Sequence, residues 1–575
     1  MRTKQFAFPN PALYKNRTKL KPVITTAMLP HPRLLAVPLS LLLTALSAAP
    51  ARAATRFDEF TAKYATPTQP ARVLAAGLLG GRGTEWLAGG GFQPDGTVVV
   101  AGVSLGPVLD LGAKEIVLGR DAALTAPTPA AKTDKKGQPE LDKDGKPKLK
   151  PFAWNHENAT AFVVRLSSDL KTIKSTTRLG WKSGGLTGAA VDAAGNIFIC
   201  GPATPGIAAL GGDVQELPAP ASDTKRSGCT HSYLARLTPD ASKIVWVRHV
   251  KAASDAPALT LDAAGQIHFS GPDFRVFDAS GKQLSAIPIP GGAGGFAAVN
   301  PVDGTIARGG EHHWQTGREP WRCPTLNIHK PDGSLLYQLY DWGGPLVGLN
   351  NLRLVSDTAI RGVTYDAQGN LIFHAWSDGG NSVALREPTD LRANAKMNGL
   401  GFSAWGAGVL SLAYVVKIET KNYRVLGGTP WMAYQKAANK PNSARINTLA
   451  ATPDGSVCFA GSSTWGLIQT GNAIGGGEPG GEFVAVLNDD CSALRFSSAM
   501  PACGQTIIDD NSADQGRWAI ASGKLNGKPV ALFLCGATER NSSYDQNPPP
   551  AVNARQPKFG GGHTDGFALL LDLSK

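Results

Sequence analysis

Tryptophan and arginine side chains are concentrated in one stretch of this 575-residue chain, with tryptophans at positions 314, 321, 342, 376 and 405. Flat aromatic rings stack on the faces of sugars, and arginine binds a carboxylate or sulfate group through paired hydrogen bonds. These side chains predict a surface that binds a neutral or anionic polysaccharide. An alternative is that they pack connecting segments onto the fold. The predicted ligand-binding residues are Trp314, Arg318, Trp321, Arg322, Trp342, Asp378, Arg386 and Trp405.

Two adjacent histidines, His312 and His313, follow Glu311 and are the best candidates for acid–base or metal chemistry. Neighbouring side chains on an extended segment point to opposite sides, so at most one of the two histidines normally faces a given site. The chain has no zinc-protease motif, no phosphate-binding loop and no dinucleotide motif. Its single G-x-S-x-G match, around Ser104, runs into a proline-containing loop instead of a helix. We therefore expect no catalytic residue, no metal and no cofactor.

Residues 1–53 are typical of a leader with a signal peptide. An apolar run over residues 34–49 follows Arg33 and precedes an Ala-Arg-Ala cleavage pattern that ends at residue 53. At about 16 residues, this run is shorter than the roughly 20 that a membrane-spanning helix needs. Met28 is a better start than Met1, because it leaves a short basic segment before the run. We expect export to the periplasm or the extracellular space, and no transmembrane segment in the mature chain.

The net charge of +12 comes mostly from this leader. Eight of the 57 Lys and Arg residues lie in residues 1–53, which contain no acidic residue, so 49 basic and 45 acidic residues remain after cleavage. A mature chain with this balance has no strongly basic surface for nucleic acid. We expect a monomer that does not bind nucleic acid.

Export would permit disulfides among the seven cysteines. Cys491 and Cys503 flank a short stretch, and Cys200 and Cys229 bracket a proline-containing segment, so both pairs are possible bridges. Because the number of cysteines is odd, one thiol must remain, and we expect it to be Cys323.

A short pattern recurs along the chain: an apolar stretch, a turn with Asp and Gly, and a second β-rich stretch that usually ends in Gly. Gly supplies the positive φ that a tight hairpin needs, and Asp or Asn tolerates it. A seventh, degenerate copy runs over residues 518–536. The six clear copies are residues 92–102, 191–201, 261–271, 300–309, 365–375 and 452–461.

A second hairpin follows most copies, so each unit has four short strands. About seven such units predict an all-β propeller. Residues 566–572 form a third strand without a fourth after it, and residues 71–79 supply the missing strand at the other end of the chain. The terminal strands are therefore expected to share one blade and close the ring, which leaves no exposed sheet edge between the ends.

These repeats resemble the bacterial secreted seven-bladed β-propeller repeat family (SBBP-type repeats). The closest matches are the Asp-x-x-Gly-Asn turn at residues 192–196 and the Asp-Gly-Phe sequence at residues 565–567. The resemblance covers most of residues 70–575 and implies the fold but no activity. The predicted organisation is a leader over 1–53, an N-terminal extension over 54–70 and a propeller over 71–575.

Long connections are predicted between the second and third strands of six units, all on one face of the ring, where binding loops are usually carried. His156, His231 and His563 lie in these connections. They cover residues 103–160, 202–232, 310–325, 377–410, 462–482 and 537–565.

We expect this face to make the chain a non-catalytic binding or scaffold protein, with a polysaccharide or a protein as its partner. The alternative is a polysaccharide lyase or hydrolase, with His312 or His313 and Arg318 or Arg322 near the propeller axis.

Overall fold

The recurring Asp and Gly residues fix the first turn of each repeat in the computed structural model. Asp192 Oδ1 accepts hydrogen bonds from the backbone N–H groups of Ala194 (2.9 Å) and Asn196 (2.8 Å). Gly195 between them has a φ of +83°, which an L side chain rarely adopts. Asp366 makes the same pair of bonds two and four residues further along the chain. The repeat pattern is therefore a hairpin-forming signal.

Residues Ala54–Lys575 form one compact unit. The leader, residues 1–53, lies outside the described residues. No helix in the described part of the chain is long and apolar enough to span a membrane. The structure describes Ala62 and residues 66–574, except for a few single positions and the gaps 105–110, 119–136, 142–159, 180–184, 204–210, 219–230, 252–257, 288–296, 314–321, 342–353, 399–406, 409–410, 436–439, 477–479, 506–517 and 539–546.

Seven sheets of four or five strands follow one another, and we number them as blades 1–7, giving the strands of each from the inner edge outward. Blade 1 contains β2 (Glu85–Phe92), β3 (Val98–Ser104), β5 (Thr160–Leu166), β6 (Ile173–Leu179) and β4 (Glu115–Leu118). Blade 2 contains β7 (Gly188–Val191), β8 (Ile197–Ala203), β10 (His231–Leu237), β11 (Ile244–Val250) and β9 (Asp213–Leu217). Blade 3 contains β12 (Ala258–Leu261), β13 (Ile267–Ser270), β14 (Phe274–Phe277) and β15 (Gln283–Ile287).

The other four blades follow the same order. Blade 4 contains β16 (Ala297–Val299), β17 (Ile306–His313), β18 (Arg322–His329) and β19 (Leu335–Leu339). Blade 5 contains β20 (Thr358–Tyr365), β21 (Leu371–Ser377), β24 (Leu412–Ile418) and β25 (Val425–Trp431). Blade 6 contains β28 (Ala444–Ala451), β29 (Val457–Ser463), β30 (Gly481–Leu487) and β31 (Leu494–Ala499). Blade 7 contains β33 (Ala519–Leu525), β34 (Lys528–Ala537), β35 (Asp565–Asp572) and β1 (Arg72–Leu79), with β32 (Cys503–Gln505) also paired to β34.

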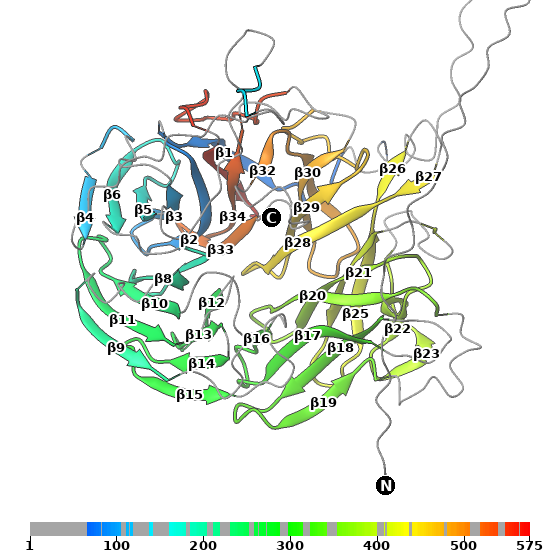
Figure 1. Cartoon of the computed structure of the whole chain (residues 1–575). Coiled ribbons are helices and arrows are strands. Elements are labelled where there is room, and N and C mark those ends of the chain that lie inside the picture. The colour runs from blue at the N-terminus through cyan, green and yellow to red at the C-terminus, as the bar shows by residue number, and fades with distance from the viewer. Residues whose placement is uncertain are drawn as a thin grey trace, which may run out of the picture. The chain divides into compact units, whose positions relative to one another are not determined.

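Inner strands of successive blades contact one another, except that β13 of blade 3 makes the contact with β16 of blade 4, and β33 of blade 7 returns to β2 of blade 1 (Figure 1). The sheets therefore form a closed seven-bladed β-propeller, which confirms the predicted all-β fold class. Two small two-stranded sheets lie outside the blades: β22 (Arg386–Glu387) with β23 (Asp390–Asn394), and β26 (Ala433–Gln435) with β27 (Lys440–Asn442).

The two ends of the chain close the ring in blade 7, as predicted. β1 pairs antiparallel with β35, from Arg72 opposite Asp572 to Leu79 opposite Gly566. The degenerate seventh repeat forms the β33–β34 hairpin, in which Asn526 and Gly527 both have positive φ, as a two-residue hairpin turn requires.

A single buried side chain, Arg495 on β31, ties both chain ends to blade 6. Its guanidinium donates to the backbone oxygens of Gln69 (3.0 Å) and Leu573 (2.7 Å). It also bonds the Asp454 carboxylate and the Ser456 hydroxyl in the first turn of blade 6. Because Arg495 is only 2% exposed, these partners are held out of water together.

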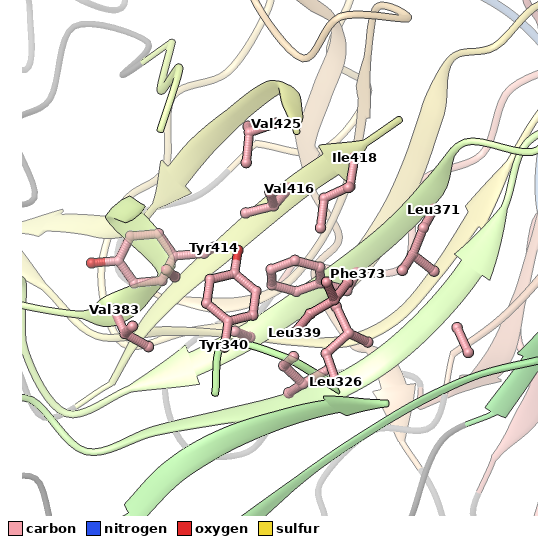
Figure 2. Packing of buried hydrophobic residues seen from close by; sticks show 14 of the residues in the cluster. Leu326, Leu339, Tyr340, Leu371, Phe373, Val383, Tyr414, Val416, Ile418 and Val425 are labelled. Carbon is pink, nitrogen blue, oxygen red and sulfur yellow. The ribbon is translucent and has the colours of Figure 1, made fainter. Parts of the chain in front are cut away.

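Buried apolar side chains fill the spaces between neighbouring blades. The cluster between blades 4 and 5 includes Leu326, Leu371 and Tyr414 from different strands. Figure 2 shows part of this cluster, in which the Tyr340 and Phe373 rings meet edge to face with centroids 5.8 Å apart. Dense packing of this kind makes the ring a rigid support for its connections.

The described cysteines correct one predicted disulfide. Cys491 and Cys503 are both thiols, because they lie at opposite ends of the six-residue strand β31, about 20 Å apart, beyond the reach of a bridge. Cys200 is buried on β8, and Cys229 lies outside the described residues, so a bridge between them stays a prediction. Cys323, expected to be the single remaining thiol, is buried on β18 and is not distinguished in this way from the other described cysteines.

Two further features were not predicted. β4 and β9, which lie within the long connections of blades 1 and 2, add a fifth strand in parallel to β6 and β11 at the outer edge. The last strand of blade 5, β25, begins at Val425. Tyr423 has a φ of +53° in the preceding turn and packs on Tyr337, 5.1 Å between ring centroids.

Replacing Arg495 tests the closure of the ring. Arg495→Met leaves the Asp454 carboxylate without its buried cation, so we expect the free energy of unfolding to fall by about 3 kcal/mol. Arg72→Met is the matched control, because the Arg72 side chain is 68% exposed in its ion pair with Asp572. We expect this substitution to lower the free energy of unfolding by no more than about 1 kcal/mol. Denaturant titration measures both changes, and equal losses would contradict the role given to Arg495.

Peptide mapping without reduction tests the cysteine geometry. We expect no Cys491–Cys503 cross-link, even after oxidation of the folded chain. Among the described cysteines, Cys503 and Cys535 lie beside each other on paired strands of blade 7, so a cross-link between these two is compatible with the fold. Recovery of a Cys491–Cys503 peptide from folded protein would show that β31 is placed wrongly.

Candidate functional site

The two ends of the blades differ in their connections. The turns between first and second strands are short, whereas the connections between second and third strands are long in six blades. Because the strands alternate in direction, the long connections all leave from the same ends of the blades, which we call the insertion-bearing face. Blade 3 has only residues 271–273 there, and the long connections cover residues 105–159, 204–230, 314–321, 378–411, 464–480 and 538–564.

The structure describes three of the eight predicted ligand-binding residues: Arg322, Asp378 and Arg386. All three lie at the insertion-bearing ends of blades 4 and 5 or in the connection of blade 5. The other five lie outside the described residues: Trp314, Arg318, Trp321, Trp342 and Trp405.

Arg322 and Asp378 are linked through Asp357, which immediately precedes β20. The Asp357 carboxylate accepts the backbone N–H of Arg322 at 3.0 Å, and its backbone oxygen accepts the N–H of Asp378 at 3.0 Å. The Arg322 guanidinium lies 5.7 Å from the ring centroid of Trp376, a cation–π distance. Both side chains are half-buried. Blades 4 and 5 thus present a stacked arginine–tryptophan pair beside an exposed aspartate.

The two predicted histidines lie on β17, opposite Cys323 and Arg322 in the pairing with β18. His313 is 47% exposed, with Nε2 3.7 Å from Glu311, which also pairs with Arg361 at 3.2 Å. Burial lowers the pKa of His312, and the nearby Asp341 partly opposes this shift. Successive residues on a strand face opposite sides, so the two imidazoles do not form one acid–base pair.

Arg386 lies in the small β22–β23 sheet, where its guanidinium donates to the side-chain oxygen of Asn394. This hydrogen bond joins the two strands of the small sheet. The described residues therefore bring Arg322, Trp376 and Asp378 together, while Arg386 has a local structural partner.

Two carboxyl groups missed by the sequence analysis lie where blade 7 meets blade 1. Burial raises the pKa of Glu85 to about 7, although Gly81 N–H and Ser104 Oγ donate to it. Burial also raises the pKa of Asp565 to about 6. The Ser104 hydroxyl donates to the Glu85 carboxylate, whereas the serine of a catalytic triad bonds a histidine.

A third carboxyl group, Glu482 at the start of the third strand of blade 6, is also protonated more readily than usual. Burial raises its pKa to about 8, although Trp518 Nε1–H donates to the carboxylate at 2.8 Å. Its environment comes from residues distant in sequence, so no local signal in the sequence identifies it. Perturbed carboxyl groups often mark functional sites, but ion pairs and burial in structural positions produce them as well.

A hollow lined by Ala76, Leu170 and Arg555, beside the closing strands, holds about 20 Å³, which is room for one water molecule. A second hollow, beside Tyr340 and Phe373, has no room for a water molecule. Neither of these two hollows accepts a sugar ring.

No family model and no curated protein matches the chain. Among solved structures, the chain is similar to a protein of unknown function from Dyadobacter fermentans DSM 18053, with 12% identity and a TM-score of 0.36 over 87% of this chain and 98% of that one. It is also similar to the Dos1 propeller, with 8% identity and a TM-score of 0.34 over 90% of this chain and 96% of that one. The fold assignment here stands on the strand pairing. A propeller supports a binding or scaffold role, without indicating the ligand.

The raised pKa of Glu482 predicts a pH-dependent stability. The folded chain keeps this proton up to about pH 8, whereas the unfolded chain releases it near pH 4.5, so this group stabilises the fold at low pH and its contribution is lost as the pH rises between these values. Glu482→Gln keeps a neutral acceptor for Trp518. We expect its free energy of unfolding, relative to wild type, to rise by about 1 kcal/mol per pH unit over this range.

Denaturant titrations at pH 5, 6.5 and 8 measure this difference. Glu216→Gln, which removes an exposed carboxylate, should show no such rise. A constant difference between Glu482→Gln and wild type would mean that Glu482 is ionised in the folded chain at pH 6.5.

Proposed function

We propose that the chain is an exported, non-catalytic binding protein that holds a polysaccharide against the insertion-bearing face of blades 4 and 5. The observation that carries this proposal is the stacked pair of Arg322 and Trp376, half-buried at the ends of β18 and β21. The exposed Asp378 lies beside this pair, because Asp357 accepts hydrogen bonds from the backbone N–H groups of both Arg322 and Asp378. Ring, guanidinium and carboxylate are the groups that lectin-like surfaces use for sugar faces, acidic substituents and hydroxyls.

The cation–π contact pre-organises the guanidinium. An arginine held flat over an aromatic ring loses less side-chain entropy when it binds a carboxylate or sulfate. Arg361 and His313 lie beside Glu311 and add further hydrogen-bond donors. Such donors suit a ligand that carries acidic groups and hydroxyl groups.

We also propose that the chain is exported and that it belongs to a family of secreted propellers. The apolar run over residues 34–49 with its Ala-Arg-Ala cleavage pattern supports secretion to the periplasm or the cell exterior. The Asp-x-x-Gly-Asn turns support membership of the bacterial secreted seven-bladed β-propeller repeat family. A monomeric ring with one elaborated face suits a protein that presents or scaffolds an envelope polysaccharide.

The experiment is to titrate the purified chain against neutral, uronic and sulfated polysaccharides, with and without chelator, while monitoring the release of products. We expect saturable binding without turnover. Arg322→Ala and Trp376→Ala should each weaken binding at least tenfold, or about 1.4 kcal/mol. Arg424→Ala is the matched control, because Arg424 is exposed at the opposite end of blade 5. We expect this variant to bind polysaccharide as tightly as wild type does.

Three outcomes would contradict the proposal in different ways. Turnover that disappears with His313→Ala would make the chain a polysaccharide lyase or hydrolase. If the chain binds none of the polysaccharides, its partner would be a protein, with a flatter contact of roughly 800 Å² on each side. If Arg424→Ala weakens polysaccharide binding as much as Arg322→Ala does, the binding site does not lie at the insertion-bearing ends of blades 4 and 5.

A further inference from the structure

Three metal-ligating side chains meet at the outer edge of blade 2, away from the residues used above. Glu216, His231 and His249 come from β9, β10 and β11, and one potential ligand atom of each lies within 4.8 Å of the other two. Strand register produces this meeting. His249 is directly opposite Glu216 on one side and opposite Tyr233, two residues after His231, on the other. The two histidines therefore lie on the same side of the sheet.

The two imidazoles are close and uncharged. Their rings stack with centroids 4.3 Å apart and planes inclined by 17°. Burial lowers the pKa of His249 to about 4 and also lowers the pKa of His231. Two imidazolium rings would repel each other at this distance, which further favours the neutral forms.

One ring nitrogen of His249 is buried without a hydrogen bond among the described residues. Its side chain is 3% exposed, and Nε2 has no hydrogen-bond partner among the described residues. Burying a polar nitrogen without a partner costs about 1–3 kcal/mol. A metal ion bound at this nitrogen would remove that cost.

We propose that Glu216, His231 and His249 bind a divalent transition-metal ion of the Zn²⁺ class. Two imidazole nitrogens and one carboxylate oxygen are a donor set that Zn²⁺ accepts, with the fourth position left to water or to a donor from a partner. Binding of the ion requires the three ligand atoms, which lie within 4.8 Å of one another, to move closer together. Glu216 is exposed on an edge strand, and Lys251, 2.6 Å from its carboxylate, is the cation that the metal replaces or joins.

This site goes beyond the proposed polysaccharide binding and is independent of it. It uses strands of blade 2, whereas the arginine–tryptophan pair uses blades 4 and 5. Binding of polysaccharide in the presence of chelator and binding of zinc in the absence of polysaccharide separate the two proposals.

Isothermal titration of the chelator-treated full chain with ZnCl₂ tests the site. We expect one equivalent of Zn²⁺ to bind with micromolar or tighter affinity, undisturbed by millimolar Mg²⁺. His231→Gln and His249→Gln should each weaken binding at least tenfold, and Glu216→Gln at least threefold. Co²⁺ bound in place of Zn²⁺ should give a visible absorption band that His231→Gln abolishes.

His313→Gln is the matched control, because it removes an exposed imidazole from the same face and should leave zinc binding unchanged. The melting temperature of each variant in chelator identifies any that fails to fold. The exposed Glu216 and the half-buried His231 keep the test valid even if His249→Gln unfolds. Absence of stoichiometric Zn²⁺ binding, or binding that survives both His231→Gln and Glu216→Gln, would overturn the proposal.

Discussion

The pairing of β1 with β35 is the constraint on which the rest of the structure depends. The ring is closed because the first strand, β1, pairs with the last strand, β35, in one blade. Arg495 reinforces this junction, because one buried guanidinium bonds backbone oxygens close to both chain ends. The contacts between blades 6, 7 and 1 are therefore formed together or lost together, and the loops are carried on a support that cannot open locally without breaking them.

Some polar residues in the short turns stabilise the fold. Lys417 reaches the buried Asp366 at 2.7 Å, and Arg236 reaches Asn196 at 2.9 Å in the turn of its own blade. At the insertion-bearing ends, Arg322 stacks on Trp376 and Asp378 is exposed. The long connections, which leave the blades from these ends, are the physical basis for placing ligand binding on this face.

The long connections also change the blades from which they leave. In blades 1 and 2 the chain returns along the outer edge as β4 and β9, parallel to the strand that it joins. In blade 2 this extra strand brings Glu216 opposite His249. An insertion that extends a sheet thus creates a cluster of metal-ligating side chains that the four-stranded unit does not contain. A short polar strand such as β9 has no sequence pattern that predicts this cluster.

The sequence by itself determined the all-β class, the seven units and the shared closing blade, because tight turns and alternating strands are local signals that Asp192, Gly195 and their repeats carry in a few residues. It also placed Arg322 and Asp378 on one face, since antiparallel connectivity follows from strand order. Only the tertiary structure decided that Cys491 cannot reach Cys503, that Glu482 keeps its proton, and that Glu216 meets two histidines. Each of these depends on strand register and burial among residues far apart in the chain, which no local pattern encodes.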